Sequence, residues 1–201
     1  MAPAREDLFN LPNLLSLVRI GSIPFMLILL YRPGRSAAWL AGGLFFVAGL
    51  TDLFDGILAR KLKKVTLLGQ FLDPVSDKLL IASLLVVLTD LGRAAAWMTV
   101  VIIGREIAVT GMRALASAQG FVVPSDYLGK LKTTIQMLAV FLLILPSPMG
   151  QADLHAWGQV VLWVAVALTA WSGLSYFISF KRSLGLAAVK KMRDSGIDSP
   201  E

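Results

Sequence analysis

Four aspartates lie close together in an otherwise apolar part of the chain, TDLFDGILARKLKKVTLLGQFLDPVSDK at positions 51–78. Asp52 and Asp55 are three residues apart, and Asp73 and Asp77 are four apart. On a helix, either spacing places two carboxylates on one face. The stretch therefore predicts two carboxylate pairs, at the end of one helix and the start of the next, aimed at a common point.

Acids grouped in this way indicate cation binding. An Asp at the centre of a membrane helix costs about 2.5 to 3.5 kcal/mol, and neighbouring carboxylates also repel each other. Oxygen ligands without nearby His or Cys suit Mg²⁺ or Mn²⁺, and four carboxylates can hold two ions about 3.5 to 4 Å apart. Such ions would bind phosphate oxygens. The alternative is a salt-bridge belt with the nearby cations, namely Arg60, Lys61, Lys63, Lys64 and Lys78.

Small and cyclic residues fit the same arrangement. Gly56 follows Asp52 by one turn, and Gly69 precedes Asp73 by one turn. A residue without a side chain lets a phosphate or ribose approach the backbone closely. Pro74 is expected in the first turn of the second helix, where the N–H that proline lacks would have had no partner.

The elements that must position these acids are membrane helices. The chain has 201 residues, of which 56% are hydrophobic and only 16% charged, against about 25% charged in soluble domains. We therefore predict an all-α integral membrane protein with a short interfacial amphipathic helix before the first span. The six predicted spans are residues 14–31, 37–59, 74–92, 95–114, 128–146 and 157–180. They form one membrane domain, 1–185, followed by a basic and polar cytoplasmic tail, 186–201.

The composition also excludes several kinds of site and partner. Cysteine is absent, which excludes disulfides, thiolate metal sites and cysteine nucleophiles. The net charge of +6 comes without any nucleic-acid-binding motif, and the cations lie at the ends of apolar runs. We therefore expect membrane lipid and phosphate-bearing substrates as partners, and no nucleic acid.

Lys and Arg predict the orientation. One side of the predicted topology collects Arg5, Arg60, Lys61, Lys63, Lys64, Arg113, Lys130, Lys132, Lys181, Arg182, Lys190, Lys191 and Arg193. The other side has Arg32, Arg35 and Arg93. Because positive charge marks the cytoplasmic side, both termini and the aspartates are expected at the cytoplasmic face of the cell (inner or plasma) membrane.

The aspartate pattern also carries a resemblance to a known family. Asp52-x-x-Asp55-Gly56-x-x-Ala59-Arg60, then eight residues, then Gly69-x-x-x-Asp73-x-x-x-Asp77, resembles the motif of the CDP-alcohol phosphatidyltransferases at every position. The resemblance implies six transmembrane helices and a homodimer. It also implies transfer of a phosphatidyl group from CDP-diacylglycerol to an alcohol, with release of CMP.

The resemblance further implies roles for individual residues. Asp52, Asp55, Asp73 and Asp77 would hold two Mg²⁺ or Mn²⁺ ions, and Asp77 would also take the proton of the alcohol. The residues expected to bind the cytidine diphosphate are Asp52, Gly56, Arg60, Thr66, Gly69 and Asn13. Asn13 and Arg19 match the N-terminal motif of the family, but a helix cap and an interface anchor are equally good readings of them.

Three further segments indicate which alcohol accepts the phosphatidyl group. FNLPNLLSLVRIGSIPF near the start, GREIAVTGMR at 104–113 and LGKLKTTIQM at 128–137 resemble the phosphatidylglycerophosphate synthase branch, whose acceptor is sn-glycerol 3-phosphate. The expected product is then phosphatidylglycerophosphate. Acceptors left open are inositol phosphate, serine and phosphatidylglycerol.

A set of cations near the fourth and fifth spans fits an acceptor that carries phosphate: Arg105, Arg113, Lys130 and Lys132. Their alternative role is that of positive-inside anchors, or, for Arg105, a structural pair with Glu106. The acids also admit a divalent-cation transporter or a prenyltransferase. Their position near one face, beside basic residues, fits a diphosphate substrate better than a transporter. A prenyltransferase would have two separated Asp-rich clusters, whereas this chain has one block of acids.

Overall fold

The computed structural model of the protein describes residues 11–62, 67–121, 127–149 and 152–194. Within these ranges, the described side chains do not include those at 11–13, 52–62, 67–71, 73, 127–128, 130 and 186–194.

Nearly all of the described chain is helical. The helices are α2 (Leu11–Tyr31), α3 (Arg35–Leu62), α4 (Leu67–Asp90), α5 (Ala96–Ala118), α6 (Tyr127–Ile144) and α7 (Leu154–Asp194). Each one covers most of a predicted span, so the all-α prediction is confirmed for these residues. Long runs of Leu, Val, Ile, Ala and Phe explain the helices, because in an apolar setting the backbone must satisfy its hydrogen bonds internally.

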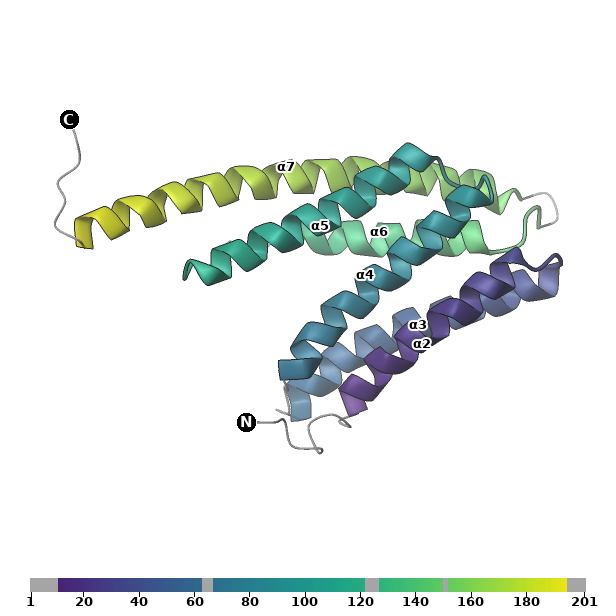
Figure 1. Ribbon diagram of the computed structural model, residues 1–201. Coiled ribbons are helices and arrows are strands. Elements are labelled where there is room, and N and C mark those ends of the chain that lie inside the picture. Colours follow the sequence, from purple (N-terminus) through teal and green to yellow (C-terminus); the bar gives the residue numbers. More distant parts are fainter. Residues whose placement is uncertain (1–10, 63–66, 122–126, 150–151, 195–201) are drawn as a thin grey trace.

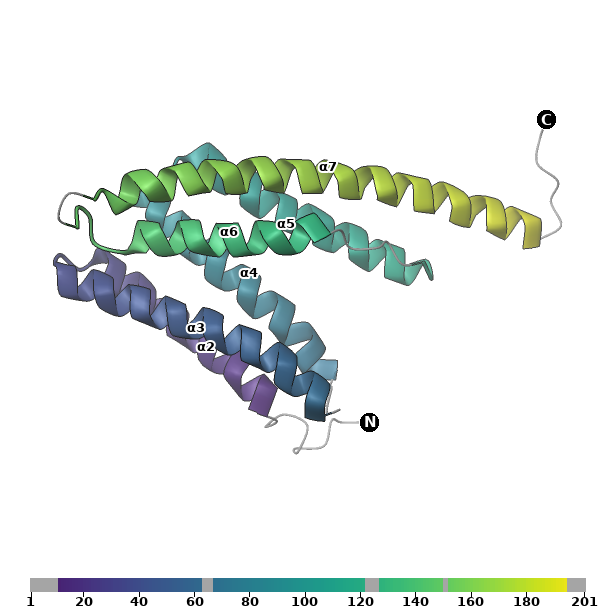
Figure 2. The same ribbon diagram turned by 180° about the vertical axis from the view of Figure 1, so that it is seen from behind.

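The helices pack in two groups that meet at α4. α2, α3 and α4 lie together, as do α5, α6 and α7 (Figure 1). The view from behind shows the same grouping (Figure 2). α4 packs against α2 on one side and contacts α5 and α6 on the other. It therefore links the helix that precedes the aspartates to the helices that carry the predicted acceptor cations.

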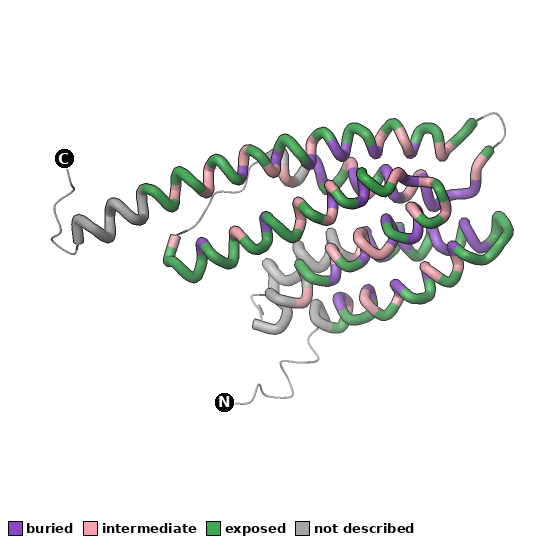
Figure 3. Tube along the Cα trace, turned by 45° about the horizontal axis from the view of Figure 1, so that its top comes forward, coloured by how far each residue is buried: buried purple, intermediate pink, exposed green. Residues whose placement is uncertain are grey.

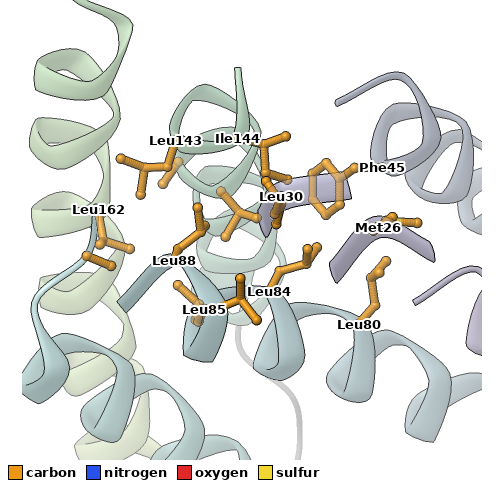
Figure 4. Close-up of a cluster of buried hydrophobic side chains, with 14 of the residues drawn as sticks. Met26, Leu30, Phe45, Leu80, Leu84, Leu85, Leu88, Leu143, Ile144 and Leu162 are labelled. Atoms are coloured by element: carbon orange, nitrogen blue, oxygen red, sulfur yellow. The ribbon is translucent and has the colours of Figure 1, made fainter. Parts of the chain in front are cut away.

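The core lies where these two groups meet. Its largest fully buried side chains include Met26 of α2, Leu84 and Leu88 of α4, Leu143 of α6 and Leu162 of α7. Figure 4 shows these side chains converging from four helices. Each buried side chain of this size contributes about 1.5 to 3 kcal/mol relative to exposure in water.

Many large apolar side chains face outward instead. Exposed positions run along the outer faces of the helices (Figure 3), and they include Phe25, Val100, Ile107 and Trp171. Two stretches of the described residues are long and apolar enough to cross a membrane by length and composition: Leu14–Tyr31, and Leu154–Gly185 in α7. An apolar exterior of this kind is what a lipid environment accommodates and water does not.

Two glycines show how the helices end and meet. Gly92 has φ +69° after the end of α4, and the Arg93 N–H donates to the carbonyl of Leu88 at 2.8 Å, a left-handed cap that reverses the chain toward α5. Gly158 brings α7 close to α6, since a Cβ there would lie 3.2 Å from the backbone nitrogen of Leu143. Closeness of this kind is typical of membrane helix packing.

One local expectation, the place of Pro74, differs from the structure, whereas the domain boundary and the N-terminal amphipathic helix stay predictions. α4 begins at Leu67, so Pro74 lies inside the helix rather than in its first turn. α7 continues to Asp194 without a break, across the expected boundary between residues 185 and 186. The amphipathic segment before the first span falls partly on residues 1–10, outside the described residues, and its remainder is continuous with α2.

Candidate active site

The four aspartates lie on two consecutive helices. Asp52 and Asp55 are in the last three turns of α3, and Asp73 and Asp77 are in the first half of α4. The backbone thus confirms that each pair is carried by a helix. The side chains of Asp52, Asp55 and Asp73 lie outside the described set, so their convergence on one point stays a prediction.

The described aspartate, Asp77, is paired with an arginine from α2. The Arg19 Nη1 donates to Asp77 Oδ1 at 2.5 Å and to the hydroxyl of Ser76 at 3.2 Å. The side chain of Arg19 is 2% exposed and that of Asp77 is 44% exposed. The carboxylate is therefore accessible, while the cation that holds it is buried between α2 and α4.

A second charged group lies on the other side of α4. Glu106 of α5 accepts from Arg105 Nη1 at 3.1 Å and forms an ion pair with Lys132 of α6. Arg105 also donates from Nη2 to the hydroxyl of Ser172 on α7, at 3.1 Å. A Cβ at Gly173 would lie 3.0 Å from Arg105 Cγ, so α7 passes close to this side chain. Three helices thus hold two cations around one carboxylate.

Lys78 connects the two groups. It follows Asp77 on α4, and its Nζ donates to the hydroxyl of Thr110 on α5. The Thr110 hydroxyl in turn donates to the backbone carbonyl of Glu106 at 2.6 Å. Among the described side chains, no carboxylate lies within ion-pair distance of Lys78. Lys78 and Thr110 therefore connect α4, next to Asp77, to Glu106 across the α4–α5 interface.

The predicted acceptor cations do not all come together. Arg105 and Lys132 meet at Glu106, as described above. Arg113 lies two turns further along α5, and its guanidinium carbon is 5.4 Å from the centre of the Tyr176 ring, a cation–π distance. The side chain of Lys130 lies outside the described set. The structure thus joins two of the four residues and places a third at a separate contact.

The positions predicted to bind the cytidine diphosphate fall mostly outside the described side chains. Gly56 and Arg60 are in α3 and Gly69 is in the first turn of α4, while Asn13 is in α2. Thr66 lies outside the described residues. Contacts between these residues and a nucleotide therefore stay predictions.

The sequence suggested Lys78 only as a member of a salt-bridge belt with the acids, and Arg19 as a helix cap or an interface anchor. The pairing of Arg19 with Asp77 was not predicted. The available signal was a charged residue inside an apolar helix, which is costly unless it is paired. The partner could not be identified, because Arg19 and Asp77 are 58 residues apart and meet only through the packing of α2 on α4.

The donor set fits a hard divalent cation. All four predicted ligands are carboxylates, the oxygen donors that Mg²⁺ and Mn²⁺ prefer, and the described one, Asp77, is accessible. Asp77 can still serve as a ligand while Arg19 contacts it, since a carboxylate has about four lone-pair sites on two oxygens.

Comparisons with known proteins identify the family of the chain. The model of the CDP-alcohol phosphatidyltransferase family matches residues 9–171. The chain is 43% identical to the CDP-diacylglycerol–glycerol-3-phosphate 3-phosphatidyltransferase of Bacillus subtilis, covering 85% of this chain and 94% of that protein. It is 39% identical to the protein of the same name from Rickettsia typhi, covering 86% and 97%. The aspartate motif, the helical fold and these matches together show that the chain belongs to the CDP-alcohol phosphatidyltransferase family.

Proposed function

We propose that this protein transfers the phosphatidyl group of CDP-diacylglycerol to sn-glycerol 3-phosphate, giving phosphatidylglycerophosphate and CMP. The relatives from Bacillus subtilis and Rickettsia typhi carry the name of this activity and align over nearly their whole length. The structural observation that supports the same acceptor is the charged group formed by Lys78, Arg105, Glu106 and Lys132.

The charge of that group suits a phosphate monoester. Arg105 and Lys132 contact the carboxylate of Glu106, and Lys78 is linked to the Glu106 backbone through Thr110, so positive charge exceeds negative charge among these described side chains. A phosphate monoester carries about −1.5 to −2 at pH 7. Serine carries no phosphate, and its single carboxylate is balanced by its own ammonium group, so it matches this excess less well.

In the proposed reaction, Asp77 is the base and glycerol 3-phosphate is the acceptor. Lys78, the next residue of α4, contacts Thr110 of α5, whereas Asp77 contacts Arg19 of α2. The hydroxyl oxygen attacks the lipid-linked phosphorus, the bond from that phosphorus to the CMP oxygen breaks, and Asp77 takes the hydroxyl proton. Because Asp77 is 44% exposed, it can release this proton to solvent.

We also propose that Asp52, Asp55, Asp73 and Asp77 hold two Mg²⁺ or Mn²⁺ ions. When bound, such ions neutralise the diphosphate and stabilise the leaving CMP. The residues expected beside the nucleotide are Asn13, Gly56, Arg60, Thr66 and Gly69.

We further propose that the protein is a homodimer that crosses the inner or plasma membrane six times, with both termini and the aspartates toward the cytoplasm. The topology is supported by the six described helices, their apolar outward faces and the distribution of Lys and Arg. The homodimer is supported by membership of the family.

The test is an acceptor screen with purified protein and CDP-diacylglycerol. CMP release would be followed with glycerol 3-phosphate, inositol phosphate, serine and phosphatidylglycerol in parallel. The proposal requires glycerol 3-phosphate to give the largest kcat/KM. A larger value with any other acceptor would reject the assignment of the acceptor, and no CMP release at all would reject the reaction.

A further inference from the structure

The ion pair between Arg19 and Asp77 joins two side chains that differ greatly in exposure. The Arg19 side chain is 2% exposed, whereas that of Asp77 is 44% exposed. Arg19 therefore offers almost no surface to a substrate. Any influence that it has on the reaction must pass through the groups that it contacts.

The described contacts of Arg19 include two on consecutive residues of α4. The same nitrogen, Arg19 Nη1, is 2.5 Å from Asp77 Oδ1 and 3.2 Å from Ser76 Oγ. Ser76 is fully buried. An aspartate side chain turns about only two bonds, so a contact that fixes one carboxylate oxygen limits the orientations open to the other.

The location of Arg19 and the exposure of Asp77 argue against an ion pair that serves only the packing of α2 on α4. Arg19 lies inside Leu14–Tyr31, one of the two stretches apolar enough to span a membrane. A charge there is costly and is typically offset by pairing within the protein. A pair that served packing alone would be expected to bury both partners, yet Asp77 keeps an accessible carboxylate beside Lys78.

We propose that Arg19 is a positioning residue, which from inside the α2–α4 interface holds the Asp77 carboxylate in the orientation that accepts the proton of the acceptor hydroxyl. This inference rests on the proposed function. Proton transfer depends on distances of about 2.6 to 3.2 Å, and a displacement of about 1 Å can cost about a hundredfold in rate. Loss of Arg19 should therefore lower turnover, as loss of Asp77 does, but by a smaller factor.

The test is a double-mutant cycle on the full chain, with Arg19→Met, Asp77→Asn and the double variant. Turnover is measured as CMP release, and affinity for CDP-diacylglycerol is measured by calorimetry. Arg19→Met should lower kcat by about 10- to 100-fold, while the KM for glycerol 3-phosphate and the CDP-diacylglycerol affinity stay within about threefold. In the Asp77→Asn background the same change should lower kcat by less than about threefold, because the group that Arg19 positions is already lost.

Arg93→Met is the matched control. Arg93 donates to the backbone carbonyls of Leu143 and Ile144 at 3.0 and 3.3 Å, at the turn between α4 and α5. Its loss should lower the thermal midpoint without changing kcat. Should Arg19→Met fail to fold, Arg19→Lys and Ser76→Ala replace it, with Arg19→Lys expected to lose more turnover than Ser76→Ala because it changes the contact to Asp77 itself.

The possible results distinguish a failure of the Arg19 proposal from a failure of the proposed function. Arg19 does not act through Asp77 if the fold-losses of kcat in the two single variants multiply in the double variant. The same conclusion follows if the affinity for CDP-diacylglycerol falls as much as kcat does. In the replacement series, Arg19→Lys with the same turnover as the unaltered protein would show the same. If the unaltered protein releases no CMP with glycerol 3-phosphate, the proposed function itself is wrong, and the role of Arg19 is rejected with it.

Discussion

Glu106 on α5 forms an ion pair with Lys132 on α6, although the two residues are 26 positions apart in the sequence. The Lys132 side chain is 3% exposed, so its charge is almost wholly removed from solvent. The same carboxylate oxygen, Glu106 Oε1, also accepts from Arg105 at 3.1 Å. Glu106 therefore holds two cations in place at the junction of α5, α6 and α7.

Replacing Glu106 should destabilise the protein. Glu106→Gln keeps the shape of the side chain but leaves the buried charge of Lys132 without its counterion, a change that costs up to about 3 to 5 kcal/mol. The thermal midpoint in detergent should fall clearly. The double variant Glu106→Gln with Lys132→Met should recover much of the loss, since neither charge then remains. A single variant as stable as the original protein would mean that solvent or lipid already compensates Lys132.

Replacing Lys78 should weaken acceptor binding. A charge-assisted hydrogen bond to phosphate contributes about 1.5 to 3 kcal/mol, so Lys78→Met should raise the KM for glycerol 3-phosphate by about 10- to 150-fold. The KM for CDP-diacylglycerol should change less. Lys181→Met is the control, because Lys181 is exposed on α7 with its Nζ 6.0 Å from the Phe177 ring centre. Equal changes in both KM values would remove Lys78 from the acceptor site.

The same kinetics test the other predicted acceptor cations. Arg105→Ala and Lys130→Ala should raise the KM for glycerol 3-phosphate more than that for CDP-diacylglycerol. Lys132→Ala should act mainly on the thermal midpoint, because the Lys132 side chain is 3% exposed and paired with Glu106. Arg113→Ala should raise the KM less than Arg105→Ala and Lys130→Ala do, because its guanidinium lies over the Tyr176 ring. An effect of Arg113→Ala as large as that of Lys130→Ala would show that Arg113 leaves Tyr176 when substrate binds.

Removal of divalent cations should abolish activity. Without cations, four carboxylates on the ends of two consecutive helices would repel a diphosphate instead of binding it. CMP release should therefore stop in EDTA and return when Mg²⁺ or Mn²⁺ is added in excess. Undiminished turnover after exhaustive chelation would contradict the two-ion site.

Asparagine variants should distinguish the aspartates from each other. Asp77→Asn cannot take a proton, so turnover should fall by about 10² to 10⁴, with CDP-diacylglycerol binding largely kept. Asp52→Asn and Asp55→Asn remove charge from predicted primary ligands, so metal-dependent binding of CDP-diacylglycerol should weaken along with turnover. Calorimetry beside CMP release separates the two patterns. Equal losses of binding in Asp77→Asn and Asp52→Asn would make Asp77 chiefly a ligand.

The sequence predicted the helices well, because each is a long apolar run and such runs have few other ways to satisfy their backbone in lipid. It placed the start of α4 too late. Pro74 was taken as a first-turn residue, whereas α4 begins at Leu67 and carries the proline in its interior.

Contacts between helices that are far apart in the sequence could not be predicted from it. The spacing of the aspartates indicated their chemistry because it is local to each helix. The pairing of Arg19 with Asp77 and of Glu106 with Lys132 depends on how far each helix is rotated about its axis when it packs. That rotation is fixed by many side chains at once, such as Met26 against Leu84 in the core, and no short pattern encodes it.

The 41-residue length of α7 has a mechanical consequence. At 1.5 Å per residue, this helix is about 60 Å long, roughly twice the thickness of the hydrocarbon core of a bilayer. The apolar stretch Leu154–Gly185 accounts for 32 of these residues, and the last turns of α7 continue past it, beyond the end of α5 (Figure 1). A fluorescent protein or affinity handle joined beyond α7 would therefore be separated from the apolar stretch by the helical turns at 186–194. Such a fusion could report on the protein in a native bilayer.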